Sequence, residues 1–273
     1  MLDVGALLTW YAATARPLPW RKTRDPYAIL VSEVMLQQTQ AARVVPYYER
    51  FLAAFPDAAA LAAAAPAEVL RHWSGLGYNR RALALQRAAV HVTAHGWPRT
   101  AAGLQELPGV GPYTAAAVAS FAFGEQVAAV DTNVRRVVER HGHAPELPLR
   151  RAADVNQAMM ELGARVCTAR AARCGECPVR SGCSAARAGG PVIAPRAAAG
   201  SRTRFEDTDR FLRGRVVAAL LAGEALPEGA ARVLDGLARD GLIALDHRGR
   251  PRLPATRMRP ADFDLVLEDP SGP

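Results

Sequence analysis

All four cysteines of the chain fall within one short stretch, at Cys167, Cys174, Cys177 and Cys183. A disulfide framework spreads its cysteines to join distant segments and belongs to an oxidising compartment. Thiols this close together instead indicate one site at which thiolates bind a metal. Zinc and a [4Fe–4S] cluster both accept four cysteines. The C-x6-C-x2-C-x5-C spacing contains a single short pair, and its wider loops favour the cluster over zinc.

A second candidate site is the string Leu107-Pro108-Gly109-Val110-Gly111, which lies between two segments of helical periodicity. Glycines on both sides of one apolar residue allow a tight turn and leave the backbone N–H groups open to a phosphate. The helix that follows adds a dipole that favours an anion at its first turn. Taken alone, the same residues also suit an ordinary turn between two helices.

Two carboxylates occupy positions at which acid–base chemistry is plausible. Glu33 lies within Ala28–Leu36, a mostly apolar helical segment where a carboxyl is costly unless it is paired or functional. Asp131 follows an apolar run and precedes another helical segment, Thr132–Gly142, so it also suits a helix N-cap.

The charge balance is basic, with 34 Lys and Arg against 26 Asp and Glu and a sequence pI of about 9.9. An excess of this size favours a polyanionic partner such as nucleic acid, although it also aids solubility. Lys22 is the single lysine of the chain, so a lysine Schiff base has one candidate side chain.

Helical periodicity dominates the chain before residue 165. It predicts helices over Leu2–Ala13, Ala28–Gln40, Pro46–Ala54, Ala67–Ser74, Arg80–Ala94, Ala115–Phe123 and Thr132–Gly142. Glycine and proline separate these segments, and no alternation is long enough to build a sheet. We therefore expect an all-α, multi-helix domain that ends in the cysteine loop.

The remainder of the chain predicts a smaller unit. Helices are expected over Arg210–Ala222 and Glu228–Asp240, and a hairpin within Gly241–Pro254, which together resemble a reduced winged-helix module. The predicted organisation is a domain at 1–185, a linker at 186–204, this module at 205–260 and an acidic, disordered tail at 261–273.

Membrane and export signals are not expected. The longest apolar run, Ala58–Ala65, is far too short to span a membrane. Residues 1–20 lack the basic segment and apolar core of a secretory signal. The sequence therefore predicts a cytoplasmic protein with no membrane partner.

The Gly109–Gly111 turn, Asp131 and the cysteine loop together resemble the helix-hairpin-helix DNA glycosylases of the endonuclease III superfamily. The N-terminal half resembles, more narrowly, the MutY-type adenine DNA glycosylases, and the likeness covers roughly residues 5–185. The motifs that carry it are LPWR at 18–21, DPY at 25–27, SEVMLQQTQ at 32–40, GLGY at 75–78 and NQAMMELGA at 156–164.

This resemblance implies a monofunctional base-excision-repair enzyme. It would hydrolyse the N-glycosidic bond of adenine mispaired with 8-oxoguanine or guanine and leave an abasic site. It implies double-stranded DNA as the partner, a [4Fe–4S] cluster on the four cysteines, and a monomer that acts at the bacterial nucleoid.

The resemblance also assigns roles at the reacting bond. Glu33 would protonate the purine at N7, and burial favours the protonated form of such a carboxyl. Asp131 would stabilise the oxocarbenium-like sugar, and Asn133 would position backbone or water. Tyr113 stands where bifunctional members carry a nucleophilic lysine, so cleavage of the strand is not expected.

Further positions correspond to residues that recognise the two bases. Arg21 and Glu161 match residues of the adenine pocket, where Glu161 would accept from the exocyclic amine. The matches to residues that probe the opposite base or wedge into the stack are Gln38, Thr39, Leu76 and Tyr78. Without the resemblance, Leu76 and Tyr78 would be interpreted as core.

Two departures from the family pattern are visible. Asn79 stands where many members have a second tyrosine, and residues 205–273 are too few for the MutT-like domain that reads 8-oxoguanine. We therefore expect a weaker 8-oxoguanine preference than in longer relatives. The arginines after the linker, such as Arg210, Arg213 and Arg215, are expected to add affinity without changing that preference.

Two other functions fit parts of the sequence. A thymine or uracil mismatch glycosylase of the same superfamily also has tyrosine at the position of Tyr113, but Glu161 and the pair Gln37-Gln38 favour adenine. A non-catalytic iron–sulfur module that binds DNA would not need both Glu33 and Asp131.

Overall fold

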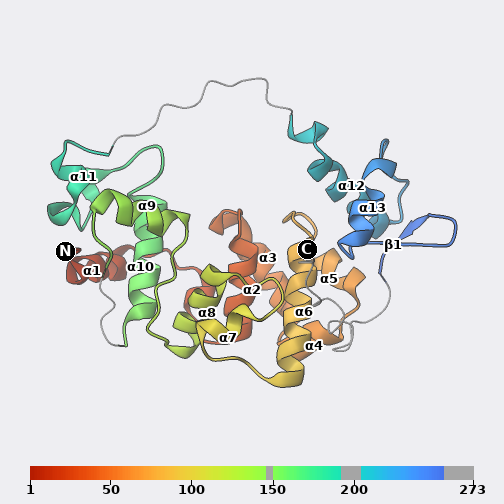
Figure 1. The fold of residues 1–273 in the computed structure, drawn as a ribbon, viewed down its shortest axis with the longest axis horizontal. Coiled ribbons are helices and arrows are strands. Elements are labelled where there is room, and N and C mark those ends of the chain that lie inside the picture. Colours follow the sequence, from red (N-terminus) through yellow and green to blue (C-terminus); the bar gives the residue numbers. More distant parts are fainter. Residues whose placement is uncertain (146–149, 192–203, 255–273) are drawn as a thin grey trace, which may run out of the picture. The chain divides into compact units, whose positions relative to one another are not determined.

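The computed structural model of the 273-residue chain describes residues 1–145, 150–191 and 204–254. This part is helical apart from one antiparallel ribbon, β1 (Ala244–Leu245) with β2 (Pro251–Arg252), and an isolated bridge between Cys167 and Ala172 (Figure 1). The predicted all-α fold class is confirmed. No helix among the described residues has both the length and the apolar character to cross a membrane.

The chain divides into two compact units that interleave along the sequence. The first comprises the described residues of 1–29, 99–106 and 110–198, and the second those of 30–98, 107–109 and 199–273. The second unit therefore joins helices of the N-terminal half to residues beyond the predicted linker. The predicted domain borders at residues 185 and 204 stay predictions.

The first unit is built on α1, α9 and α10. Its helices are α1 (Val4–Thr14), the first turn of α2 (Pro26–Leu36), α7 (Ala101–Gln105), α8 (Pro112–Phe123), α9 (Thr132–His141), α10 (Ala152–Arg165) and α11 (Ser184–Arg187), with 3-10 turns at Pro19–Arg21, Cys174–Glu176 and Arg180–Gly182. Leu7, Val134 and Leu162 bring these three helices together in one buried cluster. Asp3 caps α1 by accepting a hydrogen bond from the backbone N–H of Ala6.

The second unit packs short helices against a long one. Its elements are the rest of α2, α3 (Ala41–Ala54), α4 (Ala58–Ala63), α5 (Pro66–Trp73), α6 (Arg80–His95), α12 (Asp209–Ala222), α13 (Ala231–Arg239), a 3-10 turn at Phe205–Asp207 and the β1–β2 ribbon. Gln86, 0% exposed on α6, donates to the carbonyl oxygens of Leu61 and Ala64 at the end of α4. A buried amide thus satisfies helix-end carbonyls that would otherwise be orphaned.

Several predicted helix bounds are wrong. The helix predicted over Ala28–Gln40 ends at Leu36, because Gln38 adopts a left-handed φ of +57° that no α-helix continues through. Pro46 does not begin its helix but lies inside α3, which starts at Ala41. Val44, 0% exposed, anchors that preceding turn in the core.

Among the described residues before position 166, three α-helices fall outside the predicted segments. The sequence of α4 is almost pure alanine and therefore has no apolar periodicity, and α7 is a single short turn. The third, α10, does carry a helical pattern in Val155, Met159 and Leu162, all buried, so its signal was present in the sequence.

The predicted elements after the linker are present as α12, α13 and the β1–β2 ribbon. The likeness of this module to a winged helix stays a prediction. α11 ends at Arg187, two residues inside the predicted linker, while residues 192–203 and the predicted tail at 261–273 lie outside the described residues.

Candidate functional site

Glu33 lies in the interior of α2 and is 5% exposed. Asp25 starts this helix, since its carboxylate oxygens accept hydrogen bonds from the backbone N–H groups of Tyr27 and Ala28 at 3.1 and 3.2 Å. The neighbours Val31 and Val34 are also buried, so the carboxyl stands in a helix that is apolar on its flanks. The structure therefore places the predicted acid catalyst in the buried interior of the helix, away from bulk water.

Asp131 is the N-cap of α9 and is held at both oxygens. Its Oδ1 accepts from the backbone N–H of Val134 at 2.6 Å, and its Oδ2 accepts from Nδ2 of Asn133 at 2.8 Å. Asn133 in turn accepts through Oδ1 from Arg136 at 2.9 Å. The capping interpretation of Asp131 is therefore confirmed, and the cap also fixes the direction of the carboxylate.

Arg136 extends this network to the cysteine loop. Its guanidinium donates to the carbonyl oxygens of Gly163 at 2.7 Å and Cys167 at 2.9 Å. A Cβ added at Gly163 would lie 2.8 Å from the Cβ of Asn133, so α10 approaches α9 this closely only with glycine there. Arg136 and Gly163 were not among the predicted site residues, although Gly163 lies inside the motif quoted at 156–164 and Arg136 inside the predicted helix Thr132–Gly142.

The turn between α7 and α8 is a helical hairpin. Gly109 adopts φ +76°, and a Cβ there would lie 2.6 Å from the Cβ of Ala84. Gly111 is the N-cap of α8, Pro112 follows at its first position, and Val110 is 7% exposed. Because this helix start leaves backbone N–H groups unpaired within the helix, it suits contact with a phosphate.

Tyr113 lies in the first turn of α8 and is half-buried. It packs against a buried cluster of Ala116, Ala117 and Ala129, and its hydroxyl lies 3.7 Å from the sulfur of Met160. The residue therefore contributes to packing at the helix start.

Both carboxylate oxygens of Glu161 accept hydrogen bonds from arginines of the first unit. Its Oε1 accepts from Arg16 at 2.8 Å, its Oε2 accepts from Arg16 at 2.8 Å and from Arg21 at 2.7 Å, and Arg165 lies 3.6 Å away. Burial by itself raises the pKa of this carboxyl. The hydrogen bonds from Arg16 and Arg21 more than offset burial and lower the pKa from 4.5 to about 2. Glu161 is thus an ionised centre of a buried ion-pair network, with 0% of its side chain exposed.

Arg16 is the member of this network that sequence reasoning missed. It is 145 residues from Glu161 along the chain and belongs to none of the motifs. The aromatic ring of Tyr11 lies beside Arg21 at 5.4 Å, and the Tyr11 hydroxyl donates to Gln157 at 2.6 Å. The two arginines, Glu161 and Tyr11 therefore form one pre-organised polar cluster.

The loops that hold Gln38 and Tyr78 meet in the second unit. Both residues have positive φ, +57° and +51°, and the Tyr78 hydroxyl donates to Oε1 of Gln38. Arg81 ties the loops together by donating to the carbonyl oxygens of Val34 at 2.8 Å and Gln37 at 2.5 Å. Backbone strain of this kind persists where the surrounding structure enforces it, typically at functional sites.

The Gly75–Tyr78 turn is itself enforced by packing. Gly75 has φ +96°, and a Cβ there would lie 2.3 Å from the hydroxyl oxygen of Tyr47. Leu76 is 6% exposed, so in this structure it belongs to the core, whereas Thr39 is half-buried.

The four cysteine side chains line one small cavity of the first unit. Its other walls are apolar and cationic: Arg140, Val166, Ala172, Arg173, Arg180, Ala185, Ala186 and Pro191. The guanidinium of Arg140 lies 3.5 Å from the sulfur of Cys167. Burial raises the pKa of the Cys177 thiol. No group of three or more His, Cys, Asp or Glu within the described ranges is arranged to hold a single metal ion.

The comparisons with known proteins agree with this geometry. Residues 31–165 match the HhH-GPD superfamily of base excision DNA repair proteins. An adenine DNA glycosylase of Mycolicibacterium smegmatis is 41% identical over 279 residues, which cover 89% of this chain and 93% of that protein. One from Mycobacterium tuberculosis is 42% identical, with 91% and 92% covered, and the Homo sapiens protein is 44% identical, with 66% and 39% covered.

Two solved structures share the fold. A thermostable thymine-DNA glycosylase superposes with a TM-score of 0.62 at 30% identity, covering 68% of this chain and 95% of its own. An endonuclease III–DNA complex superposes with a TM-score of 0.58 at 24% identity, which shows the fold alone. The chain belongs to the HhH-GPD superfamily of base excision DNA repair proteins and, within it, to the family of the adenine DNA glycosylases.

Proposed function

We propose that this protein is a monomeric, cytoplasmic adenine DNA glycosylase. It hydrolyses the N-glycosidic bond of adenine opposite 8-oxoguanine or guanine in double-stranded DNA and leaves an abasic site. The observation that carries the proposal is the buried carboxyl of Glu33 in α2, 5% exposed. It stands in a chain of which 89% aligns with an adenine DNA glycosylase.

Two carboxyl groups carry the proposed reaction. Glu33 donates its proton to N7 of adenine, so that the base leaves as a neutral molecule. The carboxylate of Asp131, oriented by the N–H of Val134 and the amide of Asn133, stabilises the oxocarbenium-like sugar. Water then attacks the sugar carbon and loses a proton, which restores the acid form of Glu33 and leaves the abasic site.

Recognition of adenine falls to Arg21 rather than to Glu161. Each oxygen of Glu161 accepts two hydrogen bonds, Oε1 from the backbone N–H and Nε of Arg16 and Oε2 from Arg16 and Arg21, which uses the four acceptor sites of a carboxylate and leaves none for an exocyclic amine. Glu161 instead orients Arg21, whose planar guanidinium suits hydrogen bonding and stacking with a flipped base.

The experiment that tests the function uses duplexes with A:8-oxoG, A:G, T:G and U:G pairs. We expect excision from the two adenine duplexes and strand breakage only after alkali. Tyr113 cannot form a Schiff base, so borohydride should trap no covalent complex. Excision from T:G or U:G with no reaction on adenine would replace the proposal with the mismatch thymine or uracil glycosylase. Binding without any excision would favour the non-catalytic module.

The four cysteines fit a [4Fe–4S] cluster. They surround one cavity whose remaining walls are small apolar side chains and arginines, and cationic neighbours suit the negative charge of thiolate ligands. When bound, such a cluster would act as a cross-link that fixes the loop between Cys167 and Cys183. The loop would then present Arg170, Arg173 and Arg180 to DNA phosphates.

Removing one ligand tests the cofactor. Wild-type protein should contain four irons per chain and show a broad thiolate-to-iron absorption band. Cys177→Ser should lose the iron, the folded yield and much of the DNA affinity. Ser181→Ala, an exposed change in the same loop, should retain all three. A colourless wild-type preparation with one zinc per chain would contradict the assignment.

A further inference from the structure

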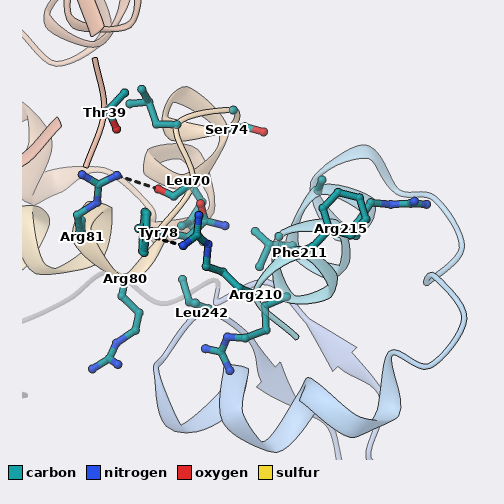
Figure 2. Close-up of a pocket in the computed structure, with 18 of the residues that line it drawn as sticks. Thr39, Leu70, Ser74, Tyr78, Arg80, Arg81, Arg210, Phe211, Arg215 and Leu242 are labelled. Atoms are coloured by element: carbon teal, nitrogen blue, oxygen red, sulfur yellow. Dashed lines mark hydrogen bonds between the residues drawn. The ribbon is translucent and has the colours of Figure 1, made fainter. Parts of the chain in front are cut away.

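The second unit contains a large cleft that neither Glu33 nor Asp131 lines. It has a volume of about 1180 Å³ and is lined on one side by residues from Gln38 to Arg43 and from Leu70 to Arg81. Its other side is formed by α12, α13 and Leu242 of the C-terminal module, and Figure 2 shows the side chains of both sides around it. A cavity of this size exceeds the usual range for a small-molecule pocket.

The lining of the cleft is cationic and aromatic. Its arginines are Arg43, Arg80, Arg81, Arg210, Arg213 and Arg215. Asp240 is the one acid among the described residues that line it, and it is paired with Arg213 and, at 3.4 Å, with Arg80. The rings of Tyr78, Phe205 and Phe211 also line it, and the guanidinium of Arg210 lies over the rings of Tyr78 and Phe205. Positive charge interleaved with aromatic rings is the chemistry that binds a nucleic-acid strand and stacks on its bases.

One contact joins the two sides of the cleft. Arg210, on α12, places its guanidinium 4.4 Å from the ring centroid of Tyr78, and its Nη1 donates to the Tyr78 hydroxyl (Figure 2). The same hydroxyl donates to Gln38. Arg81 lies 5.1 Å from the centroid of the same ring. Arg210 therefore fixes both the ring and the hydroxyl of a residue that holds a strained backbone conformation.

We propose that Arg210, held on the ring and hydroxyl of Tyr78 in this cleft, determines the preference of the enzyme for the base opposite adenine. The inference rests on the proposed function, because it takes Tyr78 and Gln38 as readers of the opposite base. Guanine presents O6 and N7 as acceptors on its major-groove edge, whereas 8-oxoguanine carries a hydrogen on N7 and presents O6 and O8. Both purines therefore offer an arginine more acceptor atoms than thymine, which offers O4 alone. The expectation that arginines after the linker add affinity alone is therefore replaced, for Arg210, by a role in specificity.

The test measures binding to duplexes in which a non-hydrolysable 2′-fluoroadenosine stands opposite 8-oxoguanine, guanine or thymine. Arg210→Ala should reduce the preference for the purine opposites over thymine by about tenfold. Arg210→Lys should keep most of the affinity and lose the preference, because lysine lacks the planar fork. Arg239→Ala is the matched control, since Arg239 is exposed on α13 and does not line the cleft.

Two outcomes would overturn the proposal. Arg210→Ala could lower the affinity for all three duplexes by the same factor, as expected for Arg239→Ala. That result would make Arg210 a simple phosphate contact. Arg210→Ala could instead raise the affinity for all three duplexes. That result would mean that the C-terminal module blocks the cleft and that DNA must displace it. Equal melting temperatures of the variants exclude misfolding as the cause. The binding readout needs no excision, so failure of the proposed glycosylase activity is detected separately on hydrolysable A:G and A:8-oxoG duplexes.

Discussion

Glu33→Gln should slow single-turnover excision of adenine by about 10²–10⁴-fold, the range attributed to a general acid. Glutamine keeps the shape of the side chain in the interior of α2, where Glu33 is 5% exposed, but it has no proton to give to N7. The adenine would then have to leave as an anion. Affinity for A:8-oxoG duplexes should change little, because the substitution removes no contact to the phosphates. Quenched-flow kinetics with enzyme in excess, combined with a binding titration, measures both quantities.

Glu49→Gln is the matched control for this change. Glu49 is exposed on α3, and the substitution removes one carboxylate from the same unit. Its excision rate should equal that of the wild type. A near-normal rate in Glu33→Gln, with the melting temperature unchanged, would show that another group supplies the proton.

Glu161→Gln should lower the free energy of unfolding at neutral pH by about 3 kcal/mol. The carboxyl has a pKa of about 2 in the folded protein against 4.5 in its ordinary state, because Arg16 and Arg21 outweigh burial. A folded-state pKa below the unfolded value gives stability that is complete above pH 5. That stability is lost as the pH falls toward 2. The difference between wild type and variant should therefore shrink as the pH falls.

Urea denaturation at a series of pH values between 7 and 3 measures this difference. Glu139→Gln, an exposed change on α9, should show no comparable loss at any of them. If the gap between Glu161→Gln and wild type stays constant with pH, the ion-pair network is not the source of the stability. The excision assay adds a second readout, since a displaced Arg21 should also weaken recognition of adenine.

Much of the local structure of this protein follows from short-range rules that apply to the sequence directly. Apolar spacing predicts α6 and α9 because one face of each must be buried, and Asp131 caps α9 because its carboxylate satisfies a free N–H group. Gly109 permits the hairpin because only glycine readily takes φ +76°. The four cysteines also reach one cavity because all of them lie in a single loop.

The contacts that give the predicted site residues their roles depend on tertiary structure. Arg16 and Glu161 are 145 residues apart, and Arg210 and Tyr78 are 132 residues apart, so no local pattern connects either pair. The pairing of Glu161 with Arg16 and Arg21 supports our proposal that Glu161 orients Arg21, while its predicted contact with adenine stays a prediction. Because Arg210 lies on the Tyr78 ring, we propose that it contributes to the preference for the base opposite adenine and not only to the positive charge of the surface. Charge and hydrogen bonding act over a few ångströms in space, and a sequence records proximity only along the chain.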